Sequence, residues 1–83
     1  MLIRFWFNFS ASTVPSPLNL GCGVTAFDLQ ESIDIMTNDV FPIFGYRKIM
    51  SVQKNIDINS LDENHVRLNM GSPVIRGVWF PKI

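Results

Sequence analysis

Residues 28–42 read DLQESIDIMTNDVFP and decide the fold class of this chain. Asp28 followed by Glu31 is the capping-box spacing of a helix start, and both carboxylates suit the positive end of the helix dipole. Apolar residues then recur at helical spacing, at positions 29, 33, 36 and 40. Pro42 ends the helix at or just before Phe41, because a proline disfavours helical backbone in the residue before it. The stretch predicts one amphipathic helix with an acidic outer face and an apolar stripe that packs on a sheet.

Four segments around this helix alternate in the manner of β-strands. Residues 2–9 carry an apolar side chain at every odd position, and residues 18–26 alternate again, with glycines on their second face that favour a bulge or a close backbone approach. Residues 47–58, which Lys54 interrupts, and residues 74–80 complete the set. The order β-β-α-β-β predicts an α+β fold in which one helix packs on a four-stranded, mainly antiparallel sheet.

Size and charge restrict the function classes. The chain has 83 residues, 47% of them hydrophobic, and is expected to form a single domain over residues 1–83. Seven basic and seven acidic residues give a net charge of zero, which argues against nucleic acid and against a polybasic membrane-surface protein. No apolar run reaches the ~18 residues of a membrane helix, and residues 2–9 do not fit a signal peptide. With Cys22 as its lone cysteine, the chain is expected in the reducing cytoplasm.

Two stretches of the chain carry a resemblance. They are LGCGVTA at residues 20–26 and LDENHV at residues 61–66, the second continuing to NMG at residues 69–71 and RGVWFP at residues 76–81. Together they resemble a set of small uncharacterised bacterial proteins of similar length, over roughly half of the chain. The resemblance implies a compact bacterial protein, and it implies no activity.

Aromatic residues supply the candidate partner site. Since the odd residues of the first strand are expected to face the helix, Trp6 lies on the opposite sheet face beside Arg4. The alternation of the last strand allows two orientations, and in one of them Trp79 lies on that same face. Phe27 shares its odd-numbered position with the outward residues of the second strand and is expected on this face too. Arg76 lies inside the last strand and is either a further interface residue or paired to an acid. Because tryptophan and arginine dominate protein–protein hot spots, this face is a candidate site for a partner protein.

A second fate for that face stays open at this point. A chain of this size has little apolar surface to spare, so residues 59–72 also fit a loop that folds across the face and makes a second small core. In that arrangement Arg76 pairs with an acid of the loop, such as Asp62, because a charge inside an apolar strand is rarely unpaired.

Reactive residues are few. Cys22 and His65 are the only residues of their kind, and they form a nucleophile and a base only if they meet in space. Cys22 also fits a small buried hydrophobic residue, because it shares a strand face with Val24. Residues 62–65 contain side chains of the kinds that bind metals, but they lack the ligand spacing of a zinc or calcium site and fit a turn. No metal and no cofactor is predicted.

These observations favour a small non-catalytic protein-binding module of the inhibitor or immunity-protein type, which acts by covering a surface of its partner. The partner is expected to be another protein or a second copy of the chain in a homodimer. One alternative is a small enzyme that uses Cys22 and His65. The other is a binder of single-stranded nucleic acid that stacks bases on sheet aromatics, and steep salt dependence would distinguish it.

Overall fold

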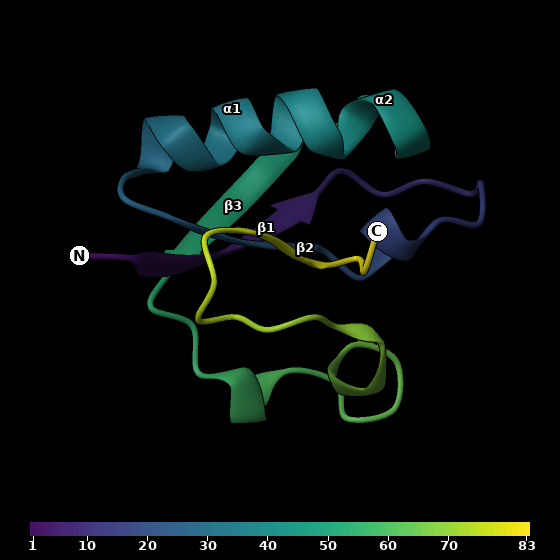
Figure 1. Cartoon of the computed structure of the whole chain (residues 1–83). Helices are drawn as coiled ribbons and strands as arrows, with labels where there is room; N and C mark the ends of the chain where they lie inside the picture. The colour runs from purple at the N-terminus through teal and green to yellow at the C-terminus, as the bar shows by residue number, and fades with distance from the viewer.

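A computed structural model describes all 83 residues. Its strands are β1 (Ile3–Phe9), β2 (Cys22–Ala26), β3 (Ile49–Lys54) and β4 (Gly77–Phe80), and its helices are α1 (Leu29–Asp39) and α2 (Phe41–Phe44). The strands form one sheet in the order β3-β1-β2-β4, and every neighbouring pair is antiparallel. α1 packs on one face of this sheet (Figure 1). The predicted α+β architecture, one helix on a four-stranded antiparallel sheet, is therefore confirmed.

The helices follow the sequence signals that flank them. Asp28 lies in extended backbone, and its carboxylate accepts a hydrogen bond from the Glu31 amide at 2.8 Å. The Glu31 carboxylate accepts in turn from the amide of Phe27 at 3.0 Å. α1 ends at Asp39, and Pro42 then lies in the first turn of the short helix α2, where the missing N–H has no intrahelical partner to lose. This extra helical turn was not predicted. Neither helix has the length and apolar content that crossing a membrane requires.

The main core lies between α1 and the sheet. Phe5 and Phe7 of β1, Val24 of β2 and Met36 of α1 have no exposed surface and pack together. The odd positions of β1 therefore face the helix, as their period of two predicted. Cys22 lies in the same core, also without exposed surface.

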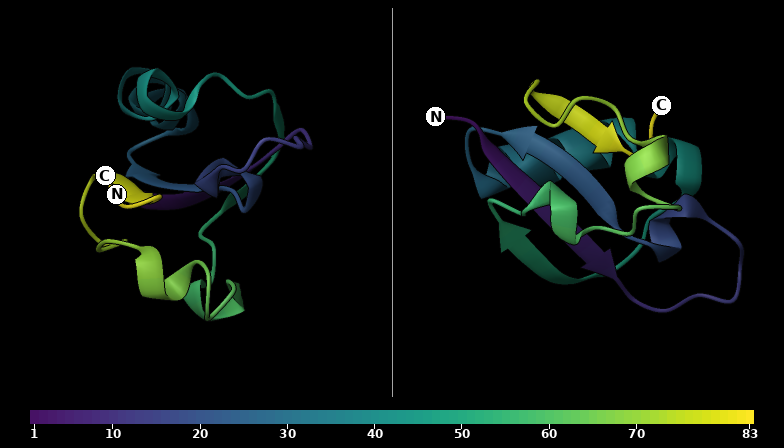
Figure 2. Two further views of the ribbon diagram at one scale, coloured as in Figure 1. Left: turned by 90° about the vertical axis from the view of Figure 1, so that its right-hand side faces the viewer. Right: turned by 90° about the horizontal axis from the view of Figure 1, so that it is seen from below.

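A second core lies on the other face of the sheet, beneath residues 55–72. This segment leaves β3 at Asn55, whose φ of 53° turns the chain, and it contains two 3₁₀ turns, Ile58–Ser60 and Arg67–Asn69 (Figure 2). The buried members of the second core are Trp6, Ile56, Val66, Trp79 and Phe80. The sequence left open whether this face is exposed to a partner or covered by residues 59–72. The structure shows that it is covered.

β3 covers Ile49–Lys54 of the predicted residues 47–58, and two other strands begin later than predicted. β2 begins at Cys22 instead of residue 18, because a 3₁₀ turn over Pro17–Asn19, capped by the side chain of Ser16, precedes it. β4 begins at Gly77 instead of residue 74. Gly77 has a φ of 130°, a conformation that breaks a regular strand and favours glycine.

Candidate functional site

Two of the five residues predicted to contact a partner are buried. Trp6 is 5% exposed and Trp79 is 1% exposed, and the centroids of their rings lie 5.7 Å apart. Each ring packs against a glycine and occupies the space that a side chain there would need. A β-carbon added at Gly21 would lie 2.4 Å from the Trp6 ring, and one added at Gly23 would lie 2.5 Å from the Trp79 ring. The prediction of an exposed aromatic face is therefore wrong for both tryptophans. Residues 55–72 cover both rings on one side, and Gly21 and Gly23 leave room for them on the other because neither has a side chain.

Arg4 belongs to the same covered face. Its Nε donates to the carbonyl of Ile56 at 3.2 Å, and the amide of Ile56 donates to the carbonyl of Arg4 at 3.3 Å. These bonds tie the start of the covering segment to β1. With the segment in place, a nucleic-acid base cannot reach Trp6 or Trp79, so these two rings cannot provide the stacking surface that the nucleic-acid alternative requires.

Phe27 and Arg76 stay exposed and lie together. The guanidinium carbon of Arg76 lies 5.8 Å from the centroid of the Phe27 ring, a cation–π distance. Its Nε and one terminal nitrogen donate to the two carboxylate oxygens of Glu31, at 3.0 and 2.8 Å. The bonds from Arg76, and then the amide of Phe27, lower the pKa of Glu31 to about 2. The predicted pairing of Arg76 with Asp62 is wrong, because the acid within reach is Glu31 on α1.

Exposed hydrophobic residues lie next to Arg76 in space or in the chain, and the groove that Arg76 lines also contains the polar residues Asn38 and Asp39. Phe27 contacts Arg76, Val74 and Ile75 precede it in the chain, and Ile43 and Ile83 line with it a groove of about 570 Å³ between α2 and β4. We call this set the Arg76 surface; its members are Phe27, Ile43, Val74, Ile75, Arg76 and Ile83. Sequence reasoning identified Phe27 and Arg76 as site residues and missed the rest. The exposure of Ile43 depends on α2, which was not predicted, and Val74 and Ile75 were assigned to a strand that begins only at Gly77.

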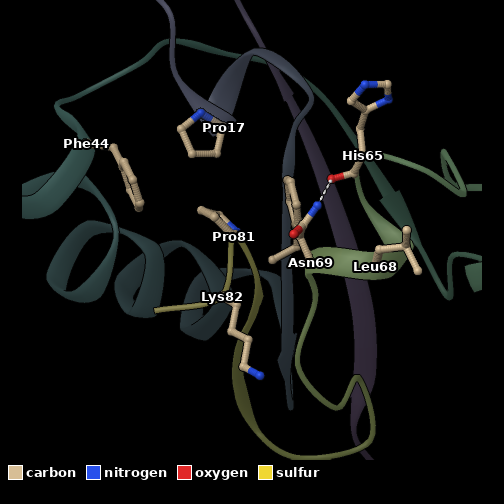
Figure 3. Close-up of a pocket in the computed structure, with 8 residues that line it drawn as sticks. Pro17, Phe44, His65, Leu68, Asn69, Pro81 and Lys82 are labelled. Carbon is tan, nitrogen blue, oxygen red and sulfur yellow. Dashed lines mark hydrogen bonds between the residues drawn. The ribbon is translucent and has the colours of Figure 1, made fainter.

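A second groove, of about 630 Å³, opens beside the covering segment and the end of the chain. Its lining residues are Pro17, Phe44, His65, Leu68, Asn69, Phe80, Pro81 and Lys82. The side-chain amide of Asn69 donates to the carbonyl of His65 at 3.0 Å, which fixes one wall (Figure 3). The ring of His65 extends away from Pro17 and Pro81. The groove therefore brings no nucleophile and base face to face.

Residues 62–65 form a hydrogen-bonded turn. Asp62 Oδ1 accepts from the amides of Asn64 and His65, each at 2.8 Å, and lies 3.2 Å from Nδ1 of His65. The amide and the side chain of His65 hold the pKa of Asp62 below its usual range. No group of three or more His, Cys, Asp or Glu side chains is placed to hold a metal ion. The arrangement is that of a local turn, in which the carboxylate serves backbone amides.

The sheet separates Cys22 from His65. Cys22 lies in the core on the α1 side, whereas His65 lies in the segment that covers the opposite face (Figure 2). Burial raises the pKa of the Cys22 thiol to about 12, so the thiol is protonated at neutral pH. The structure does not bring this pair together, because Cys22 has no exposed surface and lies in the core on the α1 side.

No protein-family model, curated protein or solved structure matches the chain. The resemblance to small bacterial proteins stays a prediction. Any functional conclusion therefore rests on the geometry of this chain itself.

Proposed function

We propose that the protein is a non-catalytic module that binds another protein through the Arg76 surface. It acts by covering part of that partner, in the manner of an inhibitor or an immunity protein. The observation that supports this proposal is the position of Arg76 beside exposed Phe27 and in one groove with exposed Ile43 and Ile83. Exposed apolar side chains beside an arginine are typical of protein–protein hot spots.

The exposed residues of this surface are not needed to complete a core. Both faces of the sheet already close over buried clusters, and none of the five hydrophobic residues belongs to either cluster. Val74 and Ile75 are the most exposed of them. Burial of one such side chain against a partner stabilises a complex by about 1.5–3 kcal/mol before the entropy of association is subtracted.

Arg76 is held in position before a partner arrives. Two hydrogen bonds to Glu31 and the ring of Phe27 restrict the guanidinium. A side chain that is already ordered avoids an entropy loss of about 0.5–1.5 kcal/mol on binding. Glu31 uses only part of the N–H donors of Arg76, so the remaining donors are available to an acceptor on the partner.

Site-specific photocrosslinking tests this proposal. A benzophenone amino acid at position 75 is expected to capture the partner on irradiation, whereas the same amino acid at position 68 is not. Leu68 is a matched control, because it is also hydrophobic and exposed but lies in the covering segment. With the captured protein purified, we expect Ile75→Asp to lower its affinity at least about tenfold and Leu68→Asp to leave it unchanged.

Equal capture at positions 75 and 68, or an affinity that Ile75→Asp does not change, would contradict the proposal. Sedimentation velocity of the purified chain tests the version in which the partner is a second copy. A dimer that Ile75→Asp converts to a monomer would identify the Arg76 surface as a homodimer interface, whereas a dimer that survives this change would place the interface elsewhere.

A further inference from the structure

β3 is the open edge of the sheet. Its only neighbour in the sheet is β1, and the view from below in Figure 2 shows no other segment beyond it. The opposite edge, β4, is partly closed, because the amide of Gly71 donates to the carbonyl of Trp79 at 2.7 Å. β3 is also the longer edge, with six residues against four. An edge strand of this kind offers unpaired main-chain groups to another chain.

The main-chain bonds identify the groups of β3 that point outward. The amide of Ile56 donates to the carbonyl of Arg4, so the even-numbered residues of β1 direct their main-chain groups toward β3. Gln53 is in register with an even-numbered residue of β1 and therefore bonds to it. By the alternation of an antiparallel pair, the N–H and C=O groups of Val52 and Lys54 point away from the sheet. These main-chain groups are free to form hydrogen bonds with an additional strand.

The surroundings of this edge are positively charged. Arg47, Lys48 and Lys54 lie in or beside β3, and neither lysine forms an ion pair. The neighbouring strand β1 adds Arg4 and contains no acid, since the first acidic residue of the chain is Asp28. Residues 40–56 contain none either. A peptide that pairs with β3 would therefore have only positively charged side chains, and no carboxylate, in the two strands nearest to it, β3 and β1.

Two large exposed side chains lie in β3 or shortly before it in the chain, Met50 within the strand and Tyr46 three residues before its start. Met50 is 61% exposed, and Tyr46 is 77% exposed with its ring packed edge-on against Phe41 at 5.2 Å. Tyrosine and methionine are enriched in protein interfaces. Strand addition places alternate side chains of the added segment against such neighbours, which supplies contacts besides the main-chain bonds.

We infer that the β3 edge binds an extended, acidic segment of a partner protein, which adds to the sheet as a fifth strand. Main-chain bonds to Val52 and Lys54 provide the pairing, and the two lysines select negative charge. This second interaction surface is separate from the Arg76 surface and does not depend on it. A second copy is disfavoured as the occupant, because it would place the cations of one β3 edge beside those of the other and supply no opposite charge.

The probe for this inference is an acetylated and amidated heptapeptide in which Glu and Val alternate, with a Lys and Val version as its control. In ¹⁵N-labelled protein, the acidic peptide is expected to slow hydrogen exchange at the amides of Val52 and Lys54. The amide of Gln53, which already bonds to β1, should not change. The basic peptide should have no effect, because it carries the charge of the edge itself.

Variants separate the contributions of charge and main chain. Lys48→Gln combined with Lys54→Gln is expected to weaken binding of the acidic peptide about fivefold at low salt. Lys82→Gln should not weaken it, because Lys82 follows β4 at the opposite edge of the sheet. Val52→Pro removes an N–H that points outward, and it leaves the hydrogen bonds between β3 and β1 intact. It should therefore abolish the protection of the Lys54 amide from hydrogen exchange by the acidic peptide, whereas Val52→Ala, which keeps the N–H, should preserve that protection.

Three results would overturn the inference. The first is binding of the acidic peptide without added protection at Val52 and Lys54. The second is no binding at millimolar peptide in a protein that circular dichroism shows to be folded. The third is a single-stranded oligothymidylate that protects the same amides and binds more tightly than the peptide, which would make the edge a nucleic-acid site.

Discussion

The indole ring of Trp79 lies against the main chain of Gly23, so closely that a β-carbon on Gly23 would come within 2.5 Å of three ring atoms. Gly23→Ala must displace either the ring or β2, and we expect it to lower the free energy of unfolding by about 1–3 kcal/mol. Gly71→Ala is the control, because its β-carbon would meet the main chain of Trp79 at 3.9 Å, an ordinary contact. Urea unfolding measures both variants. If Gly23→Ala were as stable as Gly71→Ala, the ring would not occupy this position.

Trp79 stabilises the fold instead of forming an exposed contact. Its side chain is buried in the second core, so Trp79→Ala is expected to lower the free energy of unfolding by about 3–5 kcal/mol. Phe27→Ala removes an aromatic ring that is more than half exposed, and we expect a loss of about 1 kcal/mol or less. Chemical unfolding followed by circular dichroism compares the two, and equal losses would contradict the difference in burial.

The ion pair between Glu31 and Arg76 makes stability depend on pH. Folding lowers the pKa of Glu31 from 4.5 to about 2, chiefly through the hydrogen bonds from Arg76. Because the folded pKa is depressed, the stabilisation is complete above pH 4.5 and is lost as the pH falls toward 2. Arg76→Gln should therefore make the free energy of unfolding fall less steeply across this window. Urea unfolding at a series of pH values tests this, and identical slopes for the variant and the wild type would show that the pair does not form.

Cys22 is expected to be inert in the folded protein. It has no exposed surface, and burial raises its pKa to about 12, so neither access nor thiolate is available at neutral pH. We expect Ellman's reagent to react with this thiol only as fast as the protein unfolds, and at once in concentrated urea. Rapid reaction under native conditions would contradict the placement of Cys22 in the core.

The local signals in the sequence were sufficient for the main architecture. The capping box at Asp28 predicted the start of α1, and the period of two in β1 predicted which face meets the helix. Both depend on neighbours within a few residues, which is why pattern alone identified them. Gly23 indicated a bulge or a close backbone approach; the register of β2 and β4 does shift there, but the group that lies against Gly23 is the ring of Trp79, far along the chain.

The candidate site was harder to predict, because exposure depends on long-range packing. The alternation that places Trp6 opposite the helix is correct, but it does not say whether residues 55–72 return across that face. The partner of Arg76 is likewise 45 residues away in the sequence, on α1. A bulge shifts the register between β2 and β4, so Trp79 and Phe80 both enter the second core, and no single parity describes this strand.

The position of the proposed partner site depends most on the closure of the sheet face opposite α1, because that closure buries both tryptophans and leaves the Arg76 surface exposed. Acrylamide quenching of the fluorescence of Trp6 and Trp79 tests it directly, since they are the only two tryptophans in the chain. We predict that the native protein is quenched far less than the protein unfolded in urea. Native quenching as strong as that of the unfolded chain would place the tryptophans in solvent and return them to the surface available to a partner.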